Sequence, residues 1–160
     1  MLATTILRPG MLDTNSLDWW GQRIRGGDVV RWPFGDVETA PIDERDLAAV
    51  ATRVLLDDGH GGRDYVLTGP ESLSQTEHVQ AIANSIGREI RFEELSPDEF
   101  RRETAGVWPP SAVNMLLSAW ESAVGLPAYV TSSVREITGT PARSFAQWST
   151  DNAAAFRNTL

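Results

Sequence analysis

The sequence predicts an α/β protein in which two or three short parallel strands carry a mainly helical C-terminal lobe. Short aliphatic and β-branched runs such as Thr4–Leu7 and Tyr65–Gly69 end at glycine or proline. Segments with apolar residues at helical spacing lie between them. After about residue 96 one helical segment follows another. We expect a single domain over 1–160, with residues 1–95 as the sheet part and 96–160 as the helical lobe.

Length and composition fit an ordinary globular domain. The chain has 160 residues, of which 41% are hydrophobic and 22% charged. Its formal net charge is −8, and all 14 basic residues are arginine. An acidic chain is a poor partner for phosphate backbones, so we expect no nucleic-acid partner. The absence of lysine excludes Schiff-base chemistry by this chain.

Other composition features point away from membranes and thiol chemistry. The sequence contains no cysteine, which excludes disulfides, a thiolate nucleophile and a thiolate metal site. No apolar run approaches membrane-spanning length, and no signal peptide is recognisable. We therefore expect a cytoplasmic protein without a membrane partner.

The first strand is the predicted centre of the fold. Thr4–Leu7 reads as a buried strand that stops at Pro9 and Gly10, because proline lacks a ladder donor and glycine permits a sharp turn. Ligands of open α/β sheets bind beyond the carboxyl ends of the strands. The turn after Leu7 is thus the first place to look for chemistry.

The next elements follow from apolar spacing and capping residues. A helix is predicted over 12–25, ended by two glycines, and then a short strand over 29–32. Residues 40–43 form a second short extended piece. A helix with one apolar stripe follows from about Asp46, which is a plausible N-cap.

The remaining elements alternate and then become helical. A strand over 65–69 precedes a capping box at 74–77 and a helix that stops at Gly87. A third strand is predicted over 90–95. Further helices are expected from Ser96, over 113–124, over 134–137 and from Ser144.

Four motifs occur in an order that resembles a known family. They are Thr-Ile-Leu-Arg-Pro-Gly (5–10) followed by Asn15, Ala-Pro-Ile-Asp-x-Arg-Asp-Leu-Ala (40–48), Tyr-Val-Leu-Thr-Gly-Pro-Glu-x-Leu-Ser (65–74) and Thr-Gly-x-Pro-x-Arg-Ser-Phe (138–145). Together they resemble the C-terminal half of NmrA-like atypical short-chain dehydrogenase/reductases. The resemblance implies the C-terminal part of a Rossmann-like fold and an NAD(P)-dependent oxidoreductase lineage.

The resemblance also implies what this stretch of chain lacks. No G-x-G-x-x-G follows a strand near the start, and no acidic residue stands at the spacing that holds a ribose. A Tyr-x-x-x-Lys pair cannot exist without lysine. We therefore expect a truncated NmrA-like domain that lacks the nucleotide-binding half. NAD(P) is implied by the family only, and we expect this chain alone to bind no cofactor.

The missing half leaves a strand without a neighbour. Thr4–Leu7 would normally pair on both sides, and a bare apolar edge invites another chain. We expect this edge to be covered by a second copy, as a homodimer, or by a complementary subunit.

Several residues are candidates for binding a small apolar or aromatic molecule. By resemblance, Asn15 lies near nicotinamide and substrate, although a turn or N-cap role also explains it. Arg8 and Pro9 adjoin that position, and Arg8 is alternatively a structural ion-pair residue. Large aromatic side chains line pockets as well as cores. The substrate-side tryptophans that are balanced between pocket and core are Trp19, Trp20, Trp32 and Trp108.

Acid–base and metal chemistry have weaker support. Asp13, Asp18 or Asp36 beside an apolar pocket is a candidate general acid or base if burial raises its pKa, but no motif singles one out. The only histidines, His60 and His78, have no second ligand at metal spacing, so no metal site is expected.

Three functions remain open from the sequence. The first is the substrate-binding half of an NmrA-like NAD(P)-dependent oxidoreductase that is inactive by itself. The second is a cofactor-independent cyclase, isomerase or hydrolase for a bulky apolar substrate. The third is a non-catalytic ligand- or protein-binding regulator.

Overall fold

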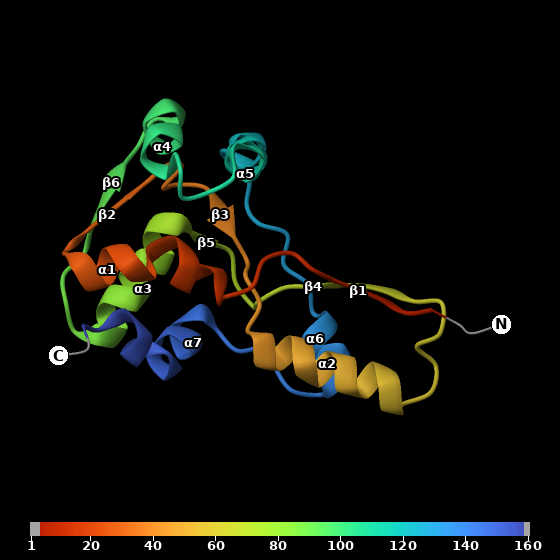
Figure 1. The fold of residues 1–160 in the computed structure, drawn as a ribbon. Helices are drawn as coiled ribbons and strands as arrows, with labels where there is room; N and C mark the ends of the chain where they lie inside the picture. Colours follow the sequence, from red (N-terminus) through yellow and green to blue (C-terminus); the bar gives the residue numbers. More distant parts are fainter. Residues whose placement is uncertain (1–3, 159–160) are drawn as a thin grey trace.

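The computed structural model describes residues 4–158, and Figure 1 shows the arrangement of its elements. The strands are β1 (Ile6–Pro9), β2 (Val29–Trp32), β3 (Glu38–Thr39), β4 (Asp64–Leu67), β5 (Leu73–Ser74) and β6 (Arg91–Glu94). The helices are η1 (Leu17–Gly21, a π-helical turn), α1 (Gln22–Gly26), α2 (Glu44–Leu56), α3 (Gln75–Ile86), α4 (Pro97–Thr104), α5 (Pro110–Ala123), α6 (Ser133–Thr138), α7 (Phe145–Asp151) and η2 (Ala153–Phe156, a 3-10 helix).

The strands form three small two-stranded sheets. Strand β1 pairs in parallel with β4, β2 pairs in parallel with β6, and β3 pairs antiparallel with β5. Within each parallel pair, a long connection that contains helices joins the first strand to the second, as parallel pairing requires. The predicted α/β fold with short parallel strands and a mainly helical C-terminal part is confirmed.

Strand β1 begins and ends later than expected. It runs from Ile6 to Pro9 instead of Thr4 to Leu7. The Ile6 amide donates to the Arg63 carbonyl at 2.9 Å, and the Gly10 amide donates to the Leu67 carbonyl at 3.3 Å. Because backbone groups alternate along a strand, the nitrogen of Pro9 faces the opposite edge. Pro9 therefore fits inside the strand without losing a ladder bond to β4.

Two helices differ from the predicted bounds. The helix expected from Leu12 starts at Asn15, because Leu12 instead forms a parallel bridge with Ile42. The helix expected from about Asp46 starts earlier, at Glu44. Its N-cap is Asp43, whose Oδ1 accepts from the Arg45 amide at 2.8 Å.

The helix starts predicted from capping residues agree with the structure. Ser74 with Glu77, and Ser96 with Glu99, form reciprocal capping boxes at α3 and α4. Each serine hydroxyl accepts from the backbone amide three residues later, and each glutamate accepts from the serine amide. Ser144 caps α7 in the same way with a glutamine.

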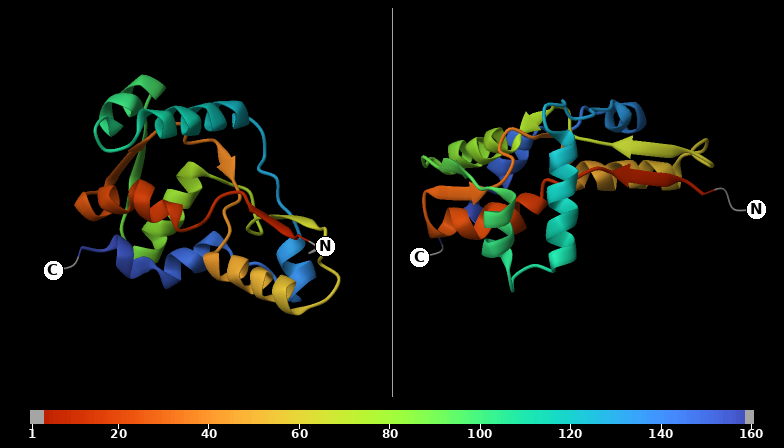
Figure 2. Two further views of the ribbon diagram at one scale, coloured as in Figure 1. Left: turned by 45° about the vertical axis from the view of Figure 1, so that its right-hand side comes forward. Right: turned by 90° about the horizontal axis from the view of Figure 1, so that it is seen from above.

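The apolar core has two parts. The larger part is rich in tryptophan and lies among α1, α3, α4, α5, α7 and the β2–β6 pair. The smaller part lies between the β1–β4 pair and the helices α2 and α6, and it contains Leu7, Ile42, Val50, Leu67 and Val134. Figures 1 and 2 show β1, β4 and α2 extending together from the larger part, with the two termini at opposite ends.

Residues 4–158 cover only one face of the β1–β4 pair. Leu7 and Tyr65 are register partners that face α2 and α6. On the opposite face, Ile6 is 43% exposed and Val66 is 38% exposed, and Arg8 and Asp64 form a surface ion pair. Within residues 4–158, no helix is long and apolar enough to cross a membrane.

Candidate functional site

A cavity of about 490 Å³ opens beyond the carboxyl ends of β1 and β4. Gly10 follows β1 and Thr68 follows β4, so the cavity lies where ligands of α/β sheets bind. Strand β3 and helix α5 supply the other walls. The lining residues are Gly10, Met11, Asn15, Trp19, Val37, Glu38, Thr39, Ala40, Thr68, Met115, Leu116, Ala119, Trp120, Ala123, Ala128 and Tyr129.

Aromatic and aliphatic side chains form most of the cavity surface. Trp19 and Trp120 meet edge to face, with ring centroids 5.7 Å apart. Met115 and Leu116 extend this wall along α5, and Tyr129 is exposed at the rim. Such walls bind flat apolar molecules by burying their surface.

A few polar groups interrupt the apolar surface. The Asn15 side chain has no hydrogen bond to any other residue in the range 4–158. The Thr39 hydroxyl is buried and likewise unpaired within that range. The Thr68 hydroxyl accepts from the Thr131 amide at 2.9 Å and donates to the Gly69 carbonyl. A ligand oxygen or nitrogen in the cavity would pair with the Asn15 amide.

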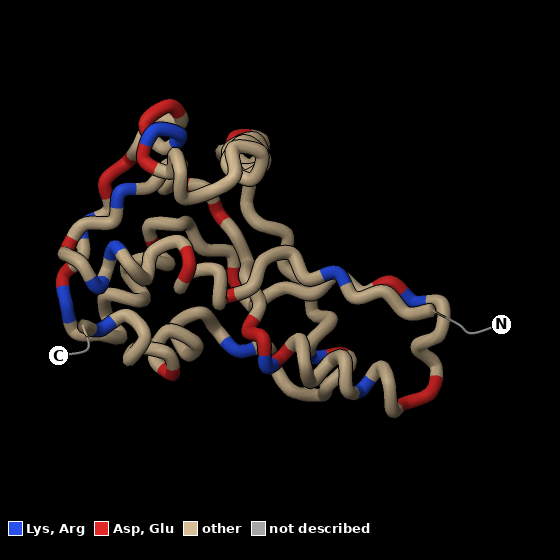
Figure 3. The backbone as a smooth tube through the Cα atoms, viewed as in Figure 1, with Lys and Arg blue, Asp and Glu red and all other residues tan. Residues whose placement is uncertain are grey.

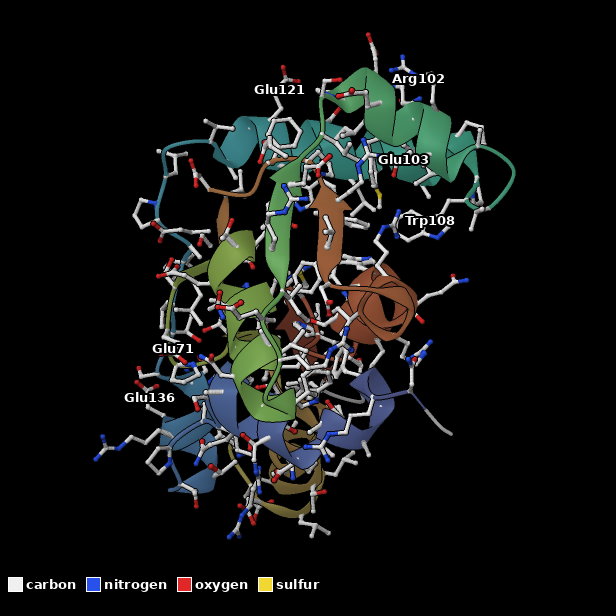
Figure 4. The ribbon with its side chains drawn as sticks, turned by 90° about the vertical axis from the view of Figure 1, so that its left-hand side faces the viewer. Glu71, Arg102, Glu103, Trp108, Glu121 and Glu136 are labelled. Carbon is white, nitrogen blue, oxygen red and sulfur yellow. The ribbon has the colours of Figure 1, made fainter. Side chains whose placement is uncertain are left out.

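Of the predicted substrate-binding residues, the structure brings Asn15 and Trp19 into this cavity. Arg8 points away, and its Nε donates to the Asp64 carboxylate at 2.8 Å. Pro9 lies in β1 and does not line the cavity. Figure 4 shows Trp108 among the residues after α4, where it lines a separate cavity of about 140 Å³ with Thr104 and Val113.

Trp20 and Trp32 belong to the core. Both side chains are fully buried. The Trp32 indole N–H donates to the Gln75 Oε1 at 2.8 Å, a polar partner that a buried tryptophan requires. Sequence spacing did not separate these two tryptophans from Trp19, because all three occur in the same N-terminal segment.

The candidate acid–base residues lie outside the cavity wall. Asp18 and Asp36 are exposed. Asp13 is fully buried, and neither carboxylate oxygen has a partner among the described residues. Burial, followed by the charges of Asp43, Glu44 and Asp46, raises the pKa of Asp13 to about 8. Asp13 is therefore protonated at neutral pH, but it does not line the cavity.

Sequence reasoning missed much of the cavity. It did not single out Trp120 as a pocket residue, which also joins the core, and it did not predict β3 with Glu38 and Thr39. A strand of two residues leaves no periodicity to detect. The exposed face of α5 did carry a signal, since Met115 is 64% exposed on an otherwise amphipathic helix.

Curated proteins match nearly the whole chain. It is 40% identical over 153 residues to (4-alkanoyl-5-oxo-2,5-dihydrofuran-3-yl)methyl phosphate reductase from Streptomyces griseus subsp. griseus, covering 95% of this chain and 54% of that protein. It is 32% identical over 158 residues to NAD(P)H azoreductase from Xenophilus azovorans, covering 97% and 54%. The chain thus spans about half the length of the curated relatives it matches. No protein-family model matches the sequence.

A solved structure has the same fold over the described chain. The NADPH-dependent quinone oxidoreductase from Escherichia coli, in complex with NADPH, superposes with a TM-score of 0.78 at 24% identity, covering 93% of this chain and 53% of that chain. These relatives and solved structures are NmrA-like or other NAD(P)-binding reductases. The match to about half of each is consistent with the C-terminal half that the motif order predicts.

The NmrA-like family implies a dinucleotide cofactor, and the described residues do not fit its phosphates. Within residues 4–158, Gly10 is the one glycine that lines the cavity, and no arginine or histidine lines it. Gly69 lies against the Pro41 carbonyl and Gly35 against Phe92, so both serve close packing within the chain. No group of three or more metal-ligating side chains occurs in residues 4–158.

Proposed function

We propose that this chain is the substrate-binding half of an NmrA-like NAD(P)-dependent oxidoreductase. The observation that carries the proposal is the aromatic cavity at the carboxyl ends of β1 and β4, lined by Trp19 and Trp120. Its ligand is a small, flat, apolar or aromatic molecule. The amide of Asn15, which lines the cavity, orients it by a hydrogen bond to a carbonyl-type oxygen.

The chain does not hold the dinucleotide by itself. Phosphates need a glycine-rich turn at a helix N-terminus or cationic side chains, and the cavity offers neither. Reduction therefore requires the nucleotide-binding half. Being about half the length of its relatives, this chain would be complemented by that half.

The nucleotide-binding half adds at the outer edge of β1. Backbone alternation leaves the Leu7 N–H on that edge, while Ile6 and Gly10 bond to β4. The uncovered face beside it carries the exposed side chains of Ile6 and Val66. A strand with an open edge beside an uncovered face is suited to adding another strand.

Two titrations test the proposed function. The first adds 1,4-naphthoquinone to the 160-residue chain and follows heat by calorimetry; the absence of cysteine removes thiol alkylation as a complication. We expect binding, and we expect Asn15→Ala to weaken it by about fivefold through one lost hydrogen bond. Asn84→Ala, at an exposed position on α3, is the matched control.

The second titration adds NADPH and follows nicotinamide fluorescence. We expect no binding at micromolar concentration. Micromolar binding of NADPH by this chain would overturn the cofactor part of the proposal. No detectable naphthoquinone binding, or equal affinity in wild type and Asn15→Ala, would overturn the substrate part.

A further inference from the structure

The charge on the cavity wall is negative. Among the described residues that line the cavity, Glu38 is the only one with a full charge. Helix α5, which forms one wall, carries a single charged side chain, Glu121, and no basic residue (Figure 3). Glu121 points outward from the fold (Figure 4) and does not line the cavity.

Glu38 is fixed in position without being neutralised. It lies in β3, where it is the register partner of Ser74. One carboxylate oxygen, Oε2, accepts from the Ser72 hydroxyl, which in turn accepts from the Ala128 amide at 2.8 Å. Its other oxygen has no partner among residues 4–158. None of the ion pairs in that range involves Glu38.

The aromatic and thioether side chains of the other walls also favour a positively charged ligand. The faces of indole and phenol rings are electron-rich and attract cations, most strongly those of tryptophan. Trp19, Trp120 and Tyr129 line the cavity together with the polarisable thioethers of Met11 and Met115. A half-buried carboxylate beside aromatic walls favours a cation and disfavours an anion.

We propose that Glu38 makes this cavity selective for a flat aromatic ligand that carries a positive charge. This inference rests on the proposed function, because it concerns the same cavity. The chain's net charge of −8 acts in the same direction by attracting cations to the surface. An anionic ligand would meet no compensating side chain in the cavity wall.

Three probes of one size separate charge from shape. They are N-methylquinolinium, a permanent cation; quinoline, which is neutral near neutral pH; and 2-naphthalenesulfonate, an anion. Each is titrated by calorimetry into the 160-residue chain at low salt. We expect the cation to bind about five- to tenfold more tightly than quinoline, and the anion to bind more weakly than either.

Two isosteric variants assign the effect to one residue. Glu38→Gln keeps an oxygen that accepts from Ser72, and we expect it to bring the affinity for the cation to within twofold of the affinity of the same variant for quinoline. Glu121→Gln removes the same charge from the outer side of α5, and we expect it to keep the wild-type preference. Near-UV circular dichroism checks that both variants retain the native packing.

The outcomes distinguish this inference from the proposed function. If quinoline binds as tightly as the cation, charge selectivity is refuted while the apolar site stands. If Glu38→Gln keeps the wild-type preference, the role of Glu38 is refuted. If none of the three probes and no naphthoquinone binds, the proposed function fails as well.

Discussion

Trp19 and Trp120 meet edge to face, with ring centroids 5.7 Å apart and ring planes at 89°. Trp19 comes from the helical turn after β1, and Trp120 from α5 in the second half of the chain. Both side chains are buried, so their packing fixes the distance between these two elements. The cavity is therefore built into the fold before a ligand binds.

Filling the cavity is expected to abolish ligand binding without unfolding the protein. Ala119 is exposed on α5 and lines the cavity, so Ala119→Phe places a ring in the space that a flat ligand needs. We expect naphthoquinone affinity to fall by about tenfold or more, which calorimetry measures.

The matched control is Ser118→Phe, which adds the same ring at an exposed α5 position outside the cavity wall. It is expected to bind like wild type. Equal losses in the two variants would mean that the cavity is not the binding site.

Asp13 is expected to make the protein less stable as the pH rises. Its pKa is about 8 in the folded state and 3.8 in a solvated chain, chiefly because of burial. Between these values the folded state binds more protons than the unfolded state, so the free energy of unfolding falls with increasing pH. Asp13→Asn removes this dependence.

We therefore expect Asp13→Asn to be more stable than wild type at pH 8 and to lose that advantage towards pH 4. Urea titrations across this range measure the difference. Asp36→Asn, at an exposed position, is the control and should follow wild type. If the free energies of unfolding of Asp13→Asn and wild type differed by the same amount at every pH, the raised pKa of Asp13 would be refuted.

The elements that carry local chemical signals could be predicted from the sequence. Capping serines with a glutamate three residues later predicted the starts of α3 and α4, because both partners of each cap are close in sequence. Gly10 likewise marked the turn after β1 and the position of the site, although Pro9 itself lies inside the strand. Asn15 followed from the family resemblance, and Trp19 was one of four tryptophans balanced between pocket and core.

The rest of the site depended on contacts between distant residues. Spacing alone cannot tell that Trp32 bonds to the buried Gln75, and is therefore a core residue, while Trp19 reaches a cavity. The two-residue pairing of β3 with β5 has no periodicity, so Glu38 and Thr39 were missed. Tertiary packing decides both cases.

His78 is expected to destabilise the protein in acid. Its ring is fully buried against Phe145, and neither ring nitrogen has a partner among the described residues. Burial lowers the pKa of His78 to about 4, from an ordinary value of 6.5. Between these values the unfolded state binds more protons, so stability falls as the pH drops from 6.5 towards 4.

The variant His78→Phe removes this loss and, by replacing an unpaired buried imidazole with an apolar ring, should add about 1 kcal/mol near neutral pH. His60→Phe is the control, since His60 is part-buried and bonds to the Tyr65 hydroxyl. Thermal unfolding at several pH values measures both. Unchanged acid sensitivity in His78→Phe would contradict the assignment.

Gly69 is expected to tolerate no side chain. It follows β4 by two residues and donates its N–H to the Ala40 carbonyl at 3.1 Å. A Cβ atom there would lie 2.1 Å from the Pro41 carbonyl oxygen, which is backbone and cannot rotate away. Gly69→Ala should therefore cost about 3 kcal/mol or more of unfolding free energy.

The cavity should be affected too, because Ala40 and Thr68, on either side of this contact, both line it. Gly26→Ala is the comparison: no atom lies within 4 Å of its added Cβ. Chemical denaturation is expected to find this control within about 0.5 kcal/mol of wild type. A Gly69→Ala variant of wild-type stability would refute the close approach.

The open edge of β1 is expected to make the isolated chain self-associate. Without a nucleotide-binding half, the Leu7 N–H, which has no partner within residues 4–158, and the exposed side chains of Ile6 and Val66 are available to a second copy. We expect a dimer at micromolar concentration, measured by size-exclusion chromatography with light scattering. Ile6→Lys places a charge on this face and should shift the chain towards monomer.

Leu55→Lys is the matched control, because Leu55 is 83% exposed at the end of α2, away from the strand edge. Leu55→Lys changes the net charge by the same amount as Ile6→Lys. A general electrostatic effect would therefore shift the monomer–dimer equilibrium equally in both variants. A specific effect shifts only Ile6→Lys. A wild-type chain that remains monomeric at these concentrations would mean that the edge does not recruit a second copy.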